Sequence, residues 1–180
     1  MGQSVQKRQI TFSEPSPFDL ANHLNRSNIF AMARKAFFSF HYQRDLWRVN
    51  VVRNSGVVEG RSAAGFHDQS LWEETKRRGD DAVKNLIDTG LAGTTVTIVL
   101  IGAETANRRF VTYEIEKSIA RGNGLFGIWI NSIKDKDGRT DSKGLIPAAL
   151  TKVGAPVYIY EYGKLGEWVE KAYNQAHSSS

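Results

Sequence analysis

Apolar residues follow two patterns that alternate along the chain from residue 36 onward. Continuous runs rich in β-branched and aromatic residues predict buried strands, at 36–40, 65–67, 95–101, 125–130 and 156–160. Apolar residues three or four positions apart predict amphipathic helices, at about 44–53, 80–91 and 107–121 and again from residue 165. Strands that alternate with helices favour right-handed crossovers. The pattern therefore predicts an α/β, flavodoxin-like fold of three layers, in which helices cover both faces of a five-stranded parallel sheet.

The chain before residue 34 shows neither pattern. It contains Pro15 and Pro17 among serine, asparagine and glutamine residues, a composition typical of flexible segments. A length of 180 residues suits one well-buried core rather than two. We therefore expect a flexible N-terminal extension at 1–33, one domain at 34–177 and a short tail at 178–180.

The composition excludes several classes of protein. The chain has no cysteine, which rules out disulfides and thiolate metal sites, and its four histidines lack the spacing of zinc ligands, so we expect no metal. The longest apolar stretch, 96–103, is far shorter than the roughly 20 residues that cross a bilayer, so we expect a cytoplasmic protein with no membrane partner. The net charge is +5, but the cations lie in separate segments beside acidic residues, which argues against a nucleic-acid partner.

A glycine motif at 122–127 has the spacing of a dinucleotide-binding fingerprint but the wrong context. It follows a predicted helix and leads into a predicted strand, whereas pyrophosphate binding requires a strand that leads into a helix. We interpret these glycines as a helix stop followed by a strand start. A phospho-receiver of similar fold is also disfavoured, because the first strand ends in Ser39 and Phe40 without an acidic cluster for magnesium.

Glu114 is the most informative polar residue in the predicted helix 107–121. Phe110 and Glu114 are four positions apart, so their side chains lie on one flank of this helix, next to its buried stripe. The stripe is predicted to consist of Val111, Ile115 and Ile119. The helix begins at the carboxyl end of the central strand, where open α/β sheets place their ligand crevices. The alternative is a solvated glutamate near a helix N-terminus, where the helix dipole favours negative charge.

Several segments together resemble a known family. They read FFSFHY at 37–42, WRVNVVRNS at 47–55, GTTVTIVLIG at 93–102 and TANRRFVTYEIEKS at 105–118, with RGNG at 121–124 and IKD at 133–135. They resemble the bacterial TIR-like family of the Thoeris antiphage sensor ThsB, over residues 34–160. In TIR enzymes the catalytic glutamate lies four residues after an aromatic residue, usually tryptophan, on the helix that follows the third strand. Here that pattern falls on Phe110 and Glu114, with phenylalanine in place of tryptophan.

The resemblance implies an enzyme that acts on NAD as its substrate, with no bound cofactor. It implies cleavage of the nicotinamide–ribose bond and synthesis of a cyclic ADP-ribose-type messenger that activates an effector protein. Glu114 is then the catalytic residue, since a carboxylate can stabilise the positive charge that develops on the ribose. The implied substrate-binding residues are Phe37, Ser39, Phe40, His41, Tyr42, Arg53, Trp72 and Phe110.

Other interpretations stay open at this point. Core packing accounts equally well for Phe40, Tyr42 and Trp72, and an ion pair accounts equally well for Arg53. TIR proteins that only scaffold also exist, so the alternative function is a non-catalytic module that binds a nucleotide or assembles with other domains. The expected partners besides NAD are a phage-derived trigger, an effector reached through the diffusible nucleotide and a second copy of the chain in a homo-oligomer.

Overall fold

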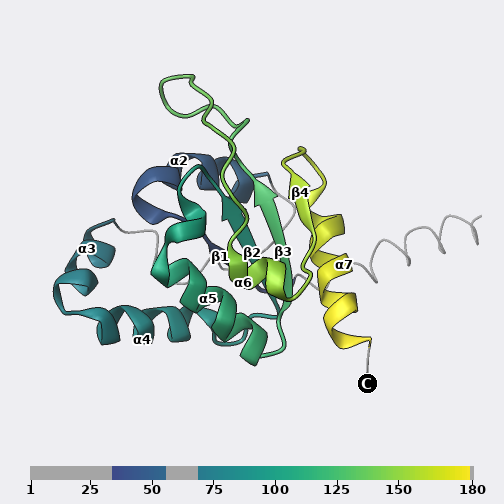
Figure 1. The fold of residues 1–180 in the computed structure, drawn as a ribbon, viewed down its shortest axis with the longest axis horizontal. Coiled ribbons are helices and arrows are strands. Elements are labelled where there is room, and N and C mark those ends of the chain that lie inside the picture. The colour runs from purple at the N-terminus through teal and green to yellow at the C-terminus, as the bar shows by residue number, and fades with distance from the viewer. Residues whose placement is uncertain (1–33, 56–68, 179–180) are drawn as a thin grey trace, which may run out of the picture. The chain divides into compact units, whose positions relative to one another are not determined.

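The structure is a computed structural model that describes residues 34–55 and 69–178. The predicted extension at 1–33 and the predicted strand at 65–67 lie outside the described residues. The elements, drawn in Figure 1, are β1 (Ala36–Ser39), α2 (Tyr42–Arg53), α3 (Gln69–Arg77), α4 (Asp80–Leu91), β2 (Val96–Ile101), the 3₁₀ turn η1 (Thr105–Asn107), α5 (Arg109–Ala120), β3 (Gly124–Trp129), α6 (Ala148–Lys152), β4 (Val157–Ile159) and α7 (Leu165–His177).

The sheet is parallel, and its strands follow the order β1-β2-β3-β4. Each strand pairs in parallel with its neighbour, so that Ala36 lies beside Val96, Val96 beside Gly124, and Gly127 beside Val157. The predicted α/β fold with a parallel sheet is therefore confirmed. The count of five strands is corrected, because the sheet of the described residues has four strands and the remaining prediction, 65–67, falls outside them.

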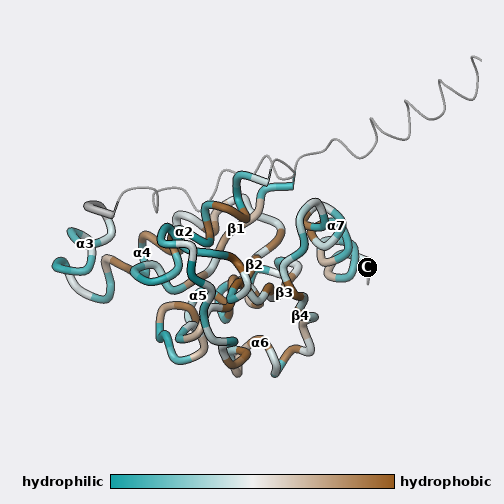
Figure 2. Tube along the Cα trace, turned by 90° about the horizontal axis from the view of Figure 1, so that it is seen from above, coloured by the Kyte–Doolittle hydropathy of each residue, from teal (hydrophilic) through white to brown (hydrophobic). Residues whose placement is uncertain are grey.

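Both faces of the sheet are covered by helices. All six residues of β2 are buried, as expected of a central strand that packs on both sides. Ile98 and Leu100 belong to the larger apolar cluster, which includes residues of α7, whereas Val99 and Ile101 belong to the cluster with α5 and α6. Figure 2 places α7 on one side of the strands and α5 and α6 on the other. Alternate residues of β2 thus pack against helices on opposite faces of the sheet.

The helix α5 departs from its predicted buried stripe at one end. Val111 and Ile115 are buried, but Ile119 is 39% exposed. It borders a hollow beside α6, which at five residues is too short to cover the last turn of α5. Glu114 is buried instead. Among the helices of the described residues, none has the length and apolar character needed to cross a bilayer.

Candidate active site

A cleft opens at the carboxyl edge of the sheet, where β1 and β2 end and where α2 and α5 begin. It encloses about 210 Å³. Six of the nine residues predicted for the site line it, namely Phe40, His41, Tyr42, Trp72, Phe110 and Glu114. Parallel strands bring their carboxyl ends to one edge, which is why segments far apart in the sequence meet here.

Glu114 is almost completely removed from solvent at 5% exposure. It lies in the second turn of α5, on the flank of the stripe formed by the buried Val111 and Ile115. The Ser39 hydroxyl, at the end of β1, donates a hydrogen bond of 2.5 Å to Oε2 of Glu114. Burial raises the pKa of Glu114 to about 8, and the Ser39 hydrogen bond acts in the opposite direction. The carboxyl group of the free protein is therefore mostly protonated at neutral pH.

A buried chain of hydrogen bonds fixes α5 against β2 behind the carboxyl group. The Ser118 hydroxyl donates to the backbone carbonyl of Glu114 at 2.7 Å and lies 2.7 Å from the hydroxyl of Thr97 on β2. The side-chain amide of Asn123 donates to the same Thr97 hydroxyl at 3.2 Å. Buried polar groups whose hydrogen bonds are all made hold their neighbours in one arrangement. The position of Glu114 relative to β2 is therefore fixed.

Four aromatic rings form a continuous wall along the cleft. The ring centroids of Phe40 and Tyr42 are 5.8 Å apart, and those of Tyr42 and Trp72 are 5.3 Å apart. Trp72 then meets Phe110 edge to face at 6.0 Å. These distances are typical of favourable aromatic pairs. The wall brings together β1, α2, α3 and α5, and it ends one helical turn from Glu114.

His41 lies at the start of α2, where its backbone carbonyl accepts a hydrogen bond from the amide of Asp45 at 2.9 Å. Its side-chain Nδ1 is buried and has no hydrogen-bond partner among the described residues. Burial lowers the pKa of His41, and the positive charges of Arg108 and Arg44 lower it further, against the opposing effect of Glu104. The imidazole is therefore neutral at pH 7 and presents an unsatisfied nitrogen.

Sequence reasoning missed the polar side chains around the cleft. Gln43, Lys76, Arg108 and Arg109 line it together with Val111. The signal was available for the two arginines, because they directly precede Phe110 at the start of α5. The spread of cations over separate segments predicts dispersed surface charges instead. In the described part of the chain no three histidine or acidic side chains gather as a metal site would require.

Comparison with known proteins shows the family to which this chain belongs. Residues 37–135 match the family described as Thoeris protein ThsB, TIR-like domain, which is more than half of the chain. The chain belongs to this family. A protein of Bacillus cereus (strain MSX-D12), whose name marks it as a candidate cyclic ADP-D-ribose synthase, ThsB1, is 49% identical over 146 residues, or 77% of this chain and 76% of that protein. The resemblance inferred from the sequence is confirmed.

Three predicted site residues do not line the cleft of this ThsB-family domain. Ser39 lies behind Glu114 and contacts it directly. Phe37 is fully buried in β1, beside Thr97 of β2, and belongs to the core. Arg53 is in the last turn of α2, about 16 Å along the helix axis from Tyr42, and burial lowers its pKa. The structure thus separates Arg53 from the other predicted residues.

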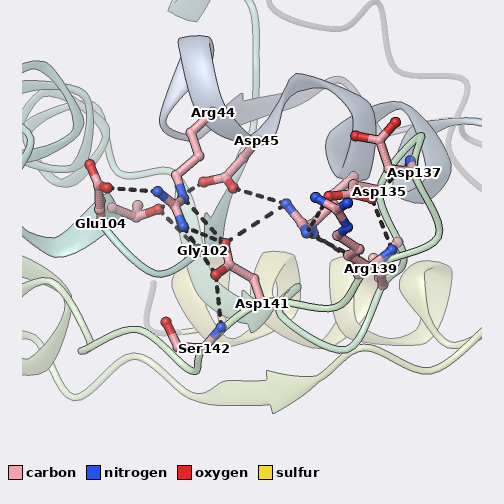
Figure 3. A network of polar contacts seen from close by, with 12 residues as sticks. Arg44, Asp45, Gly102, Glu104, Asp135, Asp137, Arg139, Asp141 and Ser142 are labelled. Carbon is pink, nitrogen blue, oxygen red and sulfur yellow. Dashed lines mark hydrogen bonds and ion pairs between the residues drawn. The ribbon is translucent and has the colours of Figure 1, made fainter.

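An ionic network braces the cleft from the side of α2 (Figure 3). Arg44 binds Glu104 at 2.7 Å and both carboxylate oxygens of Asp141 at 3.0 Å. The nearly buried Arg48 donates to the backbone carbonyl of Ile133 at 2.9 Å. These contacts tie the start of α2 to the loops after β2 and β3. Two loops at the carboxyl edge are thereby held in fixed positions.

Asp45 and Gly102 depend on each other within this network. Asp45 is fully buried, and burial raises its pKa to about 6 although Arg48 and Arg44 lower it. A Cβ atom on Gly102 would lie 2.2 Å from Oδ2 of Asp45. Only glycine therefore fits at the point where the chain leaves β2 toward the cleft.

Proposed function

We propose that this chain cleaves the nicotinamide–ribose bond of NAD and closes the remaining ADP-ribose into a cyclic messenger that activates an effector protein. The observation that carries the proposal is Glu114, a buried carboxyl group held by Ser39 at the end of a four-ring wall. The B. cereus relative, named for cyclic ADP-D-ribose synthesis, supports this reaction for the family's cleft. NAD is the substrate, and the proposal involves no bound cofactor.

Bond cleavage begins with the cationic nicotinamide ring beside Glu114. A positive charge next to a buried carboxyl group favours its ionised form, so binding lowers the pKa of Glu114. When the bond between C1′ and the ring nitrogen breaks, its electron pair moves to the nitrogen and nicotinamide leaves as a neutral molecule. The positive charge passes to the ribose, where the Glu114 carboxylate stabilises it in a site that excludes water.

Ring closure requires that an atom of the same nucleotide reaches C1′ before water does. The attacking atom is an adenine nitrogen or a ribose hydroxyl. The positive charge passes to the attacking group as the new bond forms, and a hydroxyl then loses its proton to solvent water. The rings of Phe40, Tyr42, Trp72 and Phe110 supply stacking surfaces and exclude water from the cleft. Hydrolysis to ADP-ribose is the competing outcome.

The proposal extends to the setting of the enzyme. A cytoplasmic sensor would be switched on by a phage-derived trigger, would act as a homo-oligomer and would reach its effector only through the diffusible product. The proposed fold type is flavodoxin-like. The observed order β1-β2-β3-β4 matches positions 1, 3, 4 and 5 of the flavodoxin order 2-1-3-4-5.

Turnover of NAD tests the proposal. The full chain is incubated with NAD, with and without lysate of phage-infected cells. Nicotinamide and the nucleotide products are then separated by chromatography, and mass spectrometry identifies and quantifies them. Glu114→Gln should lower kcat by about 100-fold or more. Glu116→Gln, an exposed glutamate on the same helix, is the matched control and should retain activity. Undiminished nicotinamide release by Glu114→Gln, or none by the wild type under either condition, would contradict the proposal.

A further inference from the structure

Three cations line the same cleft as Glu114, and their roles differ. We propose that Arg108 and Lys76 bind the pyrophosphate of the dinucleotide at the mouth of this cleft, and so select dinucleotides over nicotinamide nucleosides. This inference rests on the proposed function. Arg108 comes from the residue before α5 and Lys76 from the last turns of α3, so they reach the cleft from separate helices.

Arg109, the third cation, is already committed to a structural contact. Its two terminal nitrogens bind the two carboxylate oxygens of Asp80, each at 2.6 Å, which joins the start of α5 to the start of α4. The guanidinium also lies 4.6 Å from the centroid of the Phe110 ring. The Arg109 side chain is 70% exposed, but a bidentate, stacked arginine is held more firmly than a singly bonded one, so we assign Arg109 to the cleft wall.

Arg108 can exchange its partner at little cost. It pairs with Glu104, and the two side chains are 41% and 46% exposed, a setting in which ion pairs contribute little to stability. Glu104 also binds Arg44 at 2.7 Å. When a phosphate takes over Arg108, Glu104 therefore keeps a cationic partner. Arg108 is the cation of the cleft that is best placed to bind a mobile anion.

Lys76, on α3, is likewise paired with a carboxylate that has a second partner. Its ammonium lies 3.4 Å from the Glu73 carboxylate, with side-chain exposures of 36% and 35%. Glu73 also accepts a hydrogen bond of 3.1 Å from the side chain of Gln43. An incoming phosphate can therefore attract Lys76 while Glu73 stays hydrogen-bonded.

The surroundings of the mouth also favour an anion. Within the described residues no side chain caps the N-terminus of α5, whose first-turn amides start beside Arg108. His41, on the neighbouring wall, has its pKa lowered first by burial and then by the charge of Arg108. The backbone dipole of α5 and the charge of Arg108 thus have the same sign at this point.

The volume of the cleft and the exposure of its residues indicate where the nicotinamide ribose and the pyrophosphate of NAD would lie. At about 210 Å³ it is smaller than the roughly 300–1,000 Å³ of pockets that enclose a whole small molecule. Glu114 is buried, whereas Arg108 and Lys76 are partly exposed. The nicotinamide ribose therefore lies inside, against Glu114, and the pyrophosphate lies at the mouth between the two cations.

Paired substrates separate this role from a merely structural one. Rates are measured with NAD and with nicotinamide riboside, which carries the same scissile bond but no phosphate. Arg108→Gln and Lys76→Gln should each raise KM for NAD about tenfold, the effect of one charge-assisted hydrogen bond, and leave kcat for NAD and all riboside kinetics within twofold. Arg121→Gln, at the far end of α5, is the control and should change neither. Equal losses on both substrates in Arg108→Gln would overturn the inference.

A binding measurement decides the question even if no turnover occurs. Inorganic pyrophosphate is titrated calorimetrically into the wild-type chain, Arg108→Gln, Lys76→Gln and Arg121→Gln, each with its thermal unfolding recorded. Binding to the wild type and to Arg121→Gln, weakened about tenfold in the other two, would support the site. Absence of binding to the wild type, or equal binding to all four proteins, would overturn it. Absence of nicotinamide release with intact pyrophosphate binding would instead contradict the proposed function alone.

Discussion

The hydroxyl of Ser39 donates a hydrogen bond of 2.5 Å to Oε2 of Glu114 and so joins the end of β1 to the second turn of α5 across 75 positions of sequence. Both residues are buried, so this contact is made in a low-dielectric interior. It is the one factor that lowers the pKa of Glu114 against the larger effect of burial. The protonation of the carboxyl group therefore depends on burial and, to a smaller extent, on a residue of a different element.

The pH dependence of catalysis follows from this pair. The reaction requires ionised Glu114, whose pKa in the free protein is about 8. We expect kcat/KM for NAD to rise tenfold per pH unit up to about pH 8 and then to level, because kcat/KM reports the free enzyme. The acid limb of kcat should lie at lower pH, since the bound cationic ring favours the carboxylate. A flat kcat/KM between pH 6 and 9 would contradict the assigned role.

Ser39→Ala should move that acid limb. Removing the hydroxyl takes away stabilisation of the ionised carboxylate, so we expect the limb of kcat/KM to shift upward by about one pH unit and the rate at pH 7 to fall about tenfold. Ser118→Ala is the matched control, because its hydroxyl bonds the Glu114 backbone carbonyl rather than the carboxylate. It should leave the limb in place. A Ser39→Ala rate reduced equally at every pH would indicate a structural role only.

The stability of the fold should also depend on Glu114. Its pKa is about 8 in the folded chain and 4.5 when solvated, so between these values the folded state holds more protons than the unfolded state. Stability therefore falls as pH rises through this range and levels above it. Urea unfolding should show Glu114→Gln gaining about 2 kcal/mol over the wild type from pH 6.5 to pH 9. A constant difference, as expected for Glu116→Gln, would show that the carboxyl group is not buried.

Trp72 should control the fate of the ribose after nicotinamide leaves. Trp72→Ala removes ring contacts to Tyr42 and Phe110 and admits water to the cleft. We expect the ratio of linear ADP-ribose to cyclic product to rise severalfold, while nicotinamide release falls less. Trp72→Phe keeps a ring and should stay near the wild-type ratio. Mass spectrometry of the products measures both, and an unchanged ratio in Trp72→Ala would rule out a water-excluding role.

Gly102→Ala should destabilise the domain by steric overlap. The added Cβ would lie 2.2 Å from Oδ2 of the buried Asp45, so we expect a loss of at least about 2 kcal/mol in urea unfolding. Gly93→Ala is the comparison, because no atom would lie within 4 Å of its Cβ and only the positive φ of 73° is strained. That strain costs about 1 kcal/mol. Equal losses in the two variants would show that the network tolerates the extra methyl group.

The sequence was sufficient for the elements whose apolar pattern is strong. The expected strand at 95–101 and helix at 107–121 appear as β2 and as η1 with α5, because β-branched runs and helical spacing reflect burial directly. Neither α3 nor α6 was predicted. In α3 the described side chains include a single buried aromatic residue, Trp72, and α6 is shorter than two turns. Short or mostly polar helices owe their stability to tertiary packing, which no local pattern shows.

The sequence was sufficient to predict where the site residues lie in the fold, but not which side chains contact one another. Topology alone brings residues 40–42 and Glu114 to one edge of a parallel sheet. The bond between Ser39 and Glu114 depends on the register of α5 against β1, which no local pattern encodes. The same limit explains Arg53: its proximity to the site in sequence conceals its position at the opposite end of α2.

The hydrogen-bonded chain behind α5 reaches Glu114 through the backbone carbonyl, not through the side chain. Every amino acid carries that carbonyl, so this attachment of α5 to β2 does not depend on which residue occupies position 114. One nucleotide exchange in a glutamate codon yields glutamine, which has nearly the same shape and no charge. Descent from a working synthase to an inert receptor of the same shape is therefore a single mutational step, and enzymes and pseudoenzymes are expected to coexist on this architecture.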